Sequence, residues 1–233
     1  MNSRQDIPVQ GWAHPGEPFR LAAVAVGAAD WGEVLPAESR RRLARFAEGP
    51  ARARAGASEW LKACWLPREL GLERVEFATG ANGKPLPGGA ASEWGFNLSH
   101  AGEYAVAALA RGAAIGVDLE ETGRRVEAVR LAERVFSASE QAQVRAGGRA
   151  AFFALWSQKE ALMKALGCGW ADSQIQRRTR LEIRLFQTEP ATGARIWSRF
   201  VLDGAYALAV AVLGQAVPPG GDADVALENR NLV

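Results

Sequence analysis

Hydrophobic and β-branched residues form several short alternating or continuous runs along the chain, a pattern that predicts β-strands. Elsewhere apolar residues recur at three- and four-residue spacing, which predicts amphipathic helices. We expect strands at 19–26, 75–77, 96–99, 104–110, 115–120, 181–186, 195–201 and 206–212. We expect helices at 36–46, 51–65, 126–135, 139–145 and 151–166. Residues 1–18 and 217–233 show no such pattern, and we expect a loose N-terminal segment and a flexible tail there.

Two of the expected strands resemble each other. Residues 102–110 and 204–212 share Gly, Tyr and alternate Ala at matching places, and each stretch follows a Trp and a Phe. Two strands rich in Ala and Val can converge by chance. A duplication would instead give two similar α/β halves with a cleft between them. The pattern alone leaves both explanations open.

The composition of the chain limits its possible partners, cellular setting and metal ligands. The chain has 233 residues, 48% of them hydrophobic, and a net charge of +2, so a nucleic-acid-binding surface is not implied. No apolar run approaches the roughly 20 residues that span a bilayer. Cys64 and Cys168 follow no metal-ligand spacing, which favours a reduced, cytoplasmic setting. With His14 and His100 as the only histidines, carboxylates must hold any metal, which favours Mg²⁺.

The first candidate metal ligands lie in the expected strand 115–120. Asp118 and Glu120 are two residues apart, so both carboxylates point to one face, while Val117 and Leu119 point to the other. Two neighbouring like charges repel each other, and a bound cation is one reason to keep them together. A solvated strand end, where paired acids cost little, is the alternative.

A second candidate group lies in the expected helix 151–166. Glu160 and Lys164 are four residues apart and therefore neighbours on one helical face. An exposed surface pair is the ordinary explanation. Phe152, Phe153 and Trp156 indicate a buried helix, however, and a buried pair is easier to explain beside a metal and a phosphate.

Several other polar residues could bind phosphate. Ser99 and His100 follow a strand at a turn, where they would either bind phosphate oxygens or cap the turn. Lys84 lies in the turn Gly83-Lys84-Pro85. An early cluster of arginines is either a solvated helix face or a phosphate-binding surface; its members are Arg40, Arg41, Arg42, Arg45, Arg52 and Arg54.

Taken together and in this order, these segments resemble the surfactin-synthetase type of 4′-phosphopantetheinyl transferase. The resemblance spans about residues 36 to 213. The matching segments are Gly83-Lys-Pro85, Phe96-Asn-Leu-Ser-His100, Ile115-Gly-Val-Asp-Leu-Glu120, Phe136-Ser-Ala-Ser-Glu140, and Trp156-Ser-Gln-Lys-Glu160 with Lys164.

The resemblance implies roles for the acidic residues. Asp118, Glu120 and Glu160 would coordinate Mg²⁺ beside the pyrophosphate of coenzyme A. Lys164 would contact phosphate and assist proton transfer, which makes Asp118, Glu160 and Lys164 the expected catalytic residues. Glu140 lies in a segment that the family places near the metal. The base that takes the proton stays open between Glu160, a metal-bound water and a neutral Lys164, with a carboxylate or water favoured.

The resemblance also implies a nucleotide-binding set. Lys84, Ser99 and His100 would bind the 3′-phosphoadenosine end of coenzyme A, together with Lys164. Arg54 is the best-aligned arginine of the early cluster, and Arg42 is the second.

The fold implied by the resemblance is α+β: a pseudo-twofold pair of similar α/β subdomains, at 19–112 and 113–216, with the active site in the cleft between them. The implied reaction transfers 4′-phosphopantetheine from coenzyme A to a serine of an apo acyl or peptidyl carrier protein and releases adenosine 3′,5′-bisphosphate. We expect Mg²⁺ dependence, a monomer, and neither nucleic-acid nor membrane partners. A non-catalytic coenzyme A or carrier-binding module and a metal-dependent phosphohydrolase are the alternatives.

Overall fold

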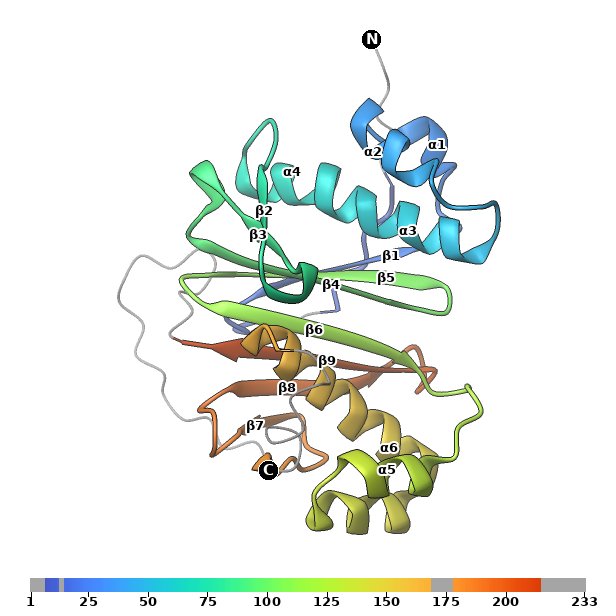
Figure 1. The fold of residues 1–233 in the computed structure, drawn as a ribbon, viewed down its shortest axis with the longest axis vertical. Helices are drawn as coiled ribbons and strands as arrows, with labels where there is room; N and C mark the ends of the chain where they lie inside the picture. The colour runs from blue at the N-terminus through green and yellow to red at the C-terminus, as the bar shows by residue number, and fades with distance from the viewer. Residues whose placement is uncertain (1–6, 13–14, 169–177, 215–233) are drawn as a thin grey trace.

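The computed structural model describes residues 7–12, 15–168 and 178–214. The chain has a mixed α/β fold in which the two larger antiparallel sheets lie between two groups of helices (Figure 1). The expected tail 217–233 lies outside the described residues, as does much of the expected loose segment 1–18. Within that segment, Gln10 exchanges two backbone hydrogen bonds with Ala23.

The first sheet has the strand order β1-β5-β4. It consists of β1 (Arg20–Ala25), β4 (Trp94–Ala101) and β5 (Tyr104–Arg111). Gly102 has a φ of +50° in the tight turn that joins β4 to β5. The strands expected at 19–26, 96–99 and 104–110 are therefore confirmed.

The second sheet has the order β6-β9-β8-β7. Its strands are β6 (Ala114–Glu121), β7 (Phe186–Thr188), β8 (Arg195–Val201) and β9 (Tyr206–Leu213). The strand expected at 181–186 is wrong. The backbone N–H groups of Leu181 and Ile183 donate to the side chains of Glu140 and Gln143 instead of to a neighbouring strand.

A nearly continuous helical segment covers the first sheet. It comprises α3 (Pro50–Trp60), a π-helical turn (Leu61–Trp65) and α4 (Leu66–Leu70), preceded by α1 (Trp31–Val34) and α2 (Ala37–Leu43). The expected end at Trp65 is wrong, because Pro67 falls in the first turn of α4, where a missing N–H is tolerated. The expected strand 75–77 is displaced to β2 (Phe77–Thr79), which pairs with β3 (Pro85–Pro87).

Helix α6 (Ala138–Leu166) packs against the second sheet, and α5 (Ala128–Val135) packs against α6. Gly148 interrupts α6 with φ +62° and ψ −144°. Residues 140 and 159 would lie about 28 Å apart along a straight helix, yet their side chains are in contact. The chain therefore turns back near Gly148, and the two helices expected at 139–145 and 151–166 are confirmed.

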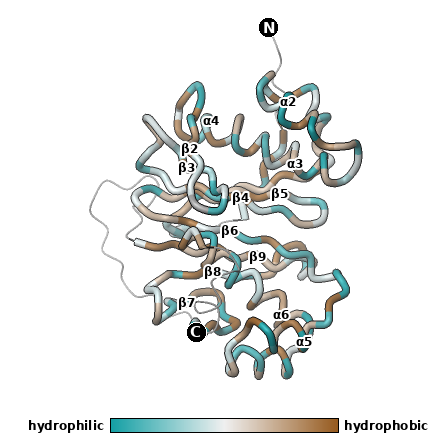
Figure 2. Tube along the Cα trace, viewed as in Figure 1, coloured by the Kyte–Doolittle hydropathy of each residue, from teal (hydrophilic) through white to brown (hydrophobic). Residues whose placement is uncertain are grey.

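The core has three parts, because successive residues of a strand point to opposite faces. In β1, Ala22 and Val24 pack toward the helices, whereas Leu21 and Ala23 pack between the two sheets. A third cluster lies between the second sheet and α6. Figure 2 shows hydrophobic stretches along the strands of both sheets.

Strand β6 and helix α6 are in backbone contact at Gly116. A Cβ atom added there would lie 2.0 Å from the carbonyl oxygen of Ala161 and 2.5 Å from the nitrogen of Ala165. Glycine is therefore required, and it fixes the position of β6 relative to α6. In the part of the chain that the structure describes, no helix is long and apolar enough to cross a membrane.

Candidate active site

A cavity of about 750 Å³ brings together residues from both halves of the chain. Helix α3, strand β4, strand β6 and helix α6 all contribute to its walls. The predicted site residues in the lining are Arg54, Ser99, His100, Asp118, Glu120, Glu160 and Lys164. Segments far apart in the sequence therefore meet in this one cavity.

Asp118 is the most buried acid of the cavity. Its Oδ1 accepts hydrogen bonds from Lys164 Nζ at 2.6 Å and from Ser99 Oγ at 3.0 Å. Its Oδ2 is buried and has no hydrogen-bond partner. Burial raises the pKa of the Asp118 carboxyl group, and the nearby Lys164 ammonium opposes that rise.

Glu120 lies on the same face of β6 as Asp118, as the two-residue spacing predicted. Burial, together with the charge of Asp118 and then that of Glu160, raises the pKa of Glu120 to about 7, against the opposing charges of Arg124 and Lys164. Arg124 donates to Glu120 Oε2 at 3.0 Å. Three carboxylates thus repel one another in one cavity, which is an arrangement that a cation stabilises.

Lys164 is the principal cation among these acids. Its Nζ donates to Asp118 Oδ1, to Ser99 Oγ at 3.2 Å and to the carbonyl oxygen of Val117 at 3.2 Å. Three acceptors match the three N–H groups of an ammonium, so the geometry fits a protonated Lys164.

The carboxylates suit Mg²⁺, which prefers hard oxygen ligands. The buried Asp118 Oδ2 is an acceptor that a bound cation would satisfy. Within the described residues, no three His, Cys, Asp or Glu side chains are already grouped closely enough to hold one ion. Binding of one ion by Asp118, Glu120 and Glu160 together therefore requires their side chains to come closer to one another.

The predicted nucleotide ligands fall into two groups. Arg54 and the exposed His100 line the cavity. Lys84 and Arg42 are not among its lining residues. Lys84 Nζ donates to the carbonyl oxygens of Ile115, at 2.9 Å, and of Lys164, at 2.6 Å. Burial lowers the pKa of Lys84 to about 8.

Arg42 and Glu140 are also bound elsewhere. Arg42 forms ion pairs with Glu38 and with Glu59, which lies on α3. Glu140 pairs with Lys159 at 3.0 Å, and its carboxylate accepts the backbone N–H of Ser137 at the start of α6. Glu140 thus holds the start of α6 and does not line the cavity of the other three acids.

Sequence reasoning missed two residues that contact this region. Asn97 Oδ1 accepts the backbone N–H of Val117 at 2.9 Å. Its two-residue spacing from Ser99 was the available signal, because it places both side chains on one face of β4. Arg124 lies just after the end of β6 and outside any helix, so its four-residue distance from Glu120 gave no signal in the sequence.

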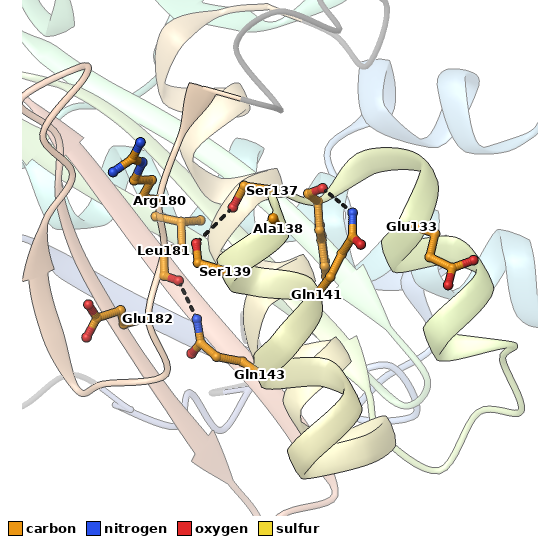
Figure 3. A pocket seen from close by; sticks show the side chains of 10 residues that line it. Glu133, Ser137, Ala138, Ser139, Gln141, Gln143, Arg180, Leu181 and Glu182 are labelled. Atoms are coloured by element: carbon orange, nitrogen blue, oxygen red, sulfur yellow. Dashed lines mark hydrogen bonds between the residues drawn. The ribbon is translucent and has the colours of Figure 1, made fainter.

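A larger cavity, of about 1040 Å³, lies at the start of α6 and contains none of the predicted site residues (Figure 3). Its polar side chains are largely engaged with neighbours. Gln141 donates to the carbonyl oxygen of Phe136, and Gln143 donates to that of Leu181. The smaller cavity is therefore the one that concentrates reactive side chains.

Residues 114–211, which include β6 and α6, match the family described as the 4′-phosphopantetheinyl transferase superfamily. The chain is 34% identical over 197 residues to the 4′-phosphopantetheinyl transferase HetI of Nostoc sp., covering 79% of this chain and 81% of that protein. It is 40% identical over 104 residues to the 4′-phosphopantetheinyl transferase psf-1 of Bacillus pumilus, covering 43% of each. It is 35% identical over 115 residues to the 4′-phosphopantetheinyl transferase AcpT of Salmonella typhimurium, covering 46% of this chain and 59% of that protein.

The similarity to HetI extends over most of both proteins. The family match over residues 114–211 includes the β6 and α6 segments whose side chains line the cavity. The family and the transferase class that the motifs predicted are therefore confirmed. The chain belongs to the 4′-phosphopantetheinyl transferase superfamily.

Proposed function

We propose that this chain transfers 4′-phosphopantetheine from coenzyme A to a serine of an apo acyl or peptidyl carrier protein. The serine oxygen forms a bond to the β-phosphorus, and the bond from that phosphorus to the bridging oxygen breaks. Adenosine 3′,5′-bisphosphate leaves, and the serine proton passes to a base in the cavity. The transferases to which the chain is similar support this reaction.

The observation that carries the proposal is the cavity itself. It gathers Asp118, Glu120, Glu160 and Lys164 in a space large enough for the pyrophosphate of a nucleotide. When bound, Mg²⁺ would neutralise the charge that develops on the departing phosphate. We assign its ligands to the three carboxylates, which supply only oxygen donors.

We assign the remaining roles on the basis of the same geometry. Lys164 already donates its three N–H groups within the protein, so it acts as a cation that offsets phosphate charge and not as the base. Glu160, or a water that it positions, takes the serine proton. Arg54 and His100 bind the 3′-phosphoadenosine end from the opposite wall. For Lys84 and Arg42 a phosphate contact stays a prediction, because both side chains are engaged elsewhere.

We further propose two similar subdomains, at 19–112 and 113–216, related by a pseudo-twofold axis. The strand orders support this arrangement. In β1-β5-β4 and in β6-β9-β8 the last strand lies between the first and the middle one. Because one chain supplies both walls of the cavity, the proposed enzyme is a monomer. Coenzyme A as substrate and two cysteines that form no disulfide support a cytoplasmic setting.

The decisive experiment incubates the protein with coenzyme A, Mg²⁺ and a set of apo carrier proteins from fatty-acid, polyketide and peptide assembly. Intact-mass spectrometry then detects a phosphopantetheine adduct, and chromatography detects free adenosine 3′,5′-bisphosphate. We expect both products, in equal amounts, and neither after addition of EDTA.

Other outcomes separate the alternatives. Release of adenosine 3′,5′-bisphosphate without an adduct would identify a phosphohydrolase. Binding of coenzyme A without any product, on every carrier, would identify a non-catalytic binding module. Either result contradicts the proposed transfer.

A further inference from the structure

Strand β6 is the end strand of its sheet, so one of its edges has no backbone partner within that sheet. The backbone groups on this edge must still find hydrogen bonds, because an unpaired buried N–H or C=O is costly. Four side chains provide them. The N–H groups of Val117 and Leu119 donate to Asn97 and Ser99, and the carbonyls of Ile115 and Val117 accept from Lys84 and Lys164.

Two of these side chains come from β4 and accept backbone hydrogen bonds from β6 on either side of Asp118. Asn97 reaches Val117, and Ser99 reaches Leu119, so a step of two residues along β4 matches a step of two along β6. Gly95 permits the close approach, since a Cβ there would lie 2.1 Å from the carbonyl oxygen of Ala113. The backbone of Asp118 is therefore held on both sides, by the hydrogen bonds of Val117 and Leu119.

The Ser99 hydroxyl group has no hydrogen-bonding capacity left. It donates its single hydrogen to Asp118 Oδ1 at 3.0 Å. Its two lone pairs accept from Leu119 N at 3.3 Å and from Lys164 Nζ at 3.2 Å. A phosphate oxygen is an acceptor and would need the hydrogen that Asp118 already receives.

We propose that Ser99, together with Asn97, is a positioning residue that holds Asp118, and that its hydroxyl group is not a phosphate ligand. By occupying Oδ1 of Asp118, Ser99 and Lys164 leave Oδ2 as the oxygen directed to a cation. This inference deepens the proposed function and rests on it for the part that concerns catalysis.

The test compares Ser99→Ala and Ser99→Thr with His100→Ala, which removes a neighbouring side chain assigned to the nucleotide. For each protein, kcat and KM for coenzyme A are measured with an apo carrier. The Kd for coenzyme A is measured by calorimetry in EDTA, and amide hydrogen exchange is followed at Leu119 and Val117.

We expect Ser99→Ala to lower kcat about tenfold to a hundredfold, because it removes a hydrogen bond to a charged group. KM and Kd for coenzyme A should change by less than about twofold. Exchange at Leu119 should accelerate while exchange at Val117, which Asn97 still holds, stays constant. Ser99→Thr should restore kcat, and His100→Ala should raise KM and Kd.

A tenfold or larger rise in the Kd for coenzyme A in Ser99→Ala, with kcat unchanged, would overturn the inference and make Ser99 a phosphate ligand. Unchanged exchange at Leu119 would also overturn it. If Ser99→Ala does not fold, Ser99→Cys replaces it, because a thiol keeps the shape but bonds weakly. If the wild-type chain transfers nothing, the proposed function fails, whereas Kd and exchange still decide the role of Ser99.

Discussion

Lys159 and Glu140 form an ion pair that is almost wholly excluded from solvent, with 1% and 0% of the two side chains exposed. The pair joins the two parts of α6 on either side of Gly148, and Lys159 Nζ also donates to Thr179 Oγ1 at 2.6 Å. Burial lowers the pKa of Lys159, while the charge of Glu140 opposes that shift. The residue next to Lys159 is the proposed metal ligand Glu160. The ion pair therefore also fixes the backbone position of Glu160.

Replacing Glu140 by Gln should strongly destabilise the protein. The substitution breaks a buried ion pair by removing one of its charges, which typically costs about 3–5 kcal/mol. Urea denaturation at neutral pH measures the loss. Glu93→Gln is the control, because Glu93 forms an exposed pair with Arg111 and should change stability by less than about 1 kcal/mol. Equal losses in the two variants would contradict the buried-pair explanation.

Lys84 should make the stability of the protein depend on pH in the alkaline range. Its pKa is lowered from 10.5 to about 8 by burial. Between these values the unfolded chain binds the proton and the folded chain does not, so the free energy of unfolding rises with pH. The difference between wild type and Lys84→Met, from urea denaturation at several pH values, should grow in favour of wild type from pH about 8 to about 10.5. A constant difference across that range would show that Lys84 is not buried as described.

In the absence of metal, Glu120 should make the free energy of unfolding depend on pH in the opposite direction. Its pKa is raised from 4.5 to about 7, so between these values the folded chain holds a proton that the unfolded chain has lost. The free energy of unfolding therefore falls as pH rises through this range. In EDTA, Glu120→Gln should be more stable than wild type at pH 8, and the gain should shrink toward pH 4.5. A gain that is independent of pH would argue against a raised pKa.

Asp118→Asn should abolish transfer. The substitution keeps the size of the side chain but removes the charge that Lys164 and a cation both require. We expect kcat to fall by about a thousandfold or more in excess Mg²⁺, which is the scale of losing a central electrostatic group. The value of kcat is obtained by monitoring adduct formation on an apo carrier by mass spectrometry. Wild-type rates in this variant would remove Asp118 from the site.

Local spacing predicted much of the site. A two-residue step placed Asp118 and Glu120 on one face of β6, and a four-residue step placed Glu160 beside Lys164 on α6. Both rules hold because strand and helix geometry repeat regularly. The prediction that these residues meet in one cavity came from the family resemblance, because no local rule places a strand against a distant helix.

The contacts that the sequence did not predict form only in the folded chain. Lys84 binds carbonyls because β6 is an edge strand, a property of sheet order and not of the turn that contains Lys84. Arg42 pairs with Glu59 across two helices. Glu140 meets Lys159 because the chain reverses near Gly148, and periodicity did not show how closely the two helices would pack.

The contact at Gly116 has a consequence for how the protein unfolds and loses activity. Two proposed ligands lie on β6 and the third on α6, and the two backbones touch with no side chain between them. Neither element can shift without the other, so the catalytic groups share the cooperativity of the whole core. On heating, activity and tryptophan fluorescence should be lost at a single midpoint, without a folded but inactive intermediate.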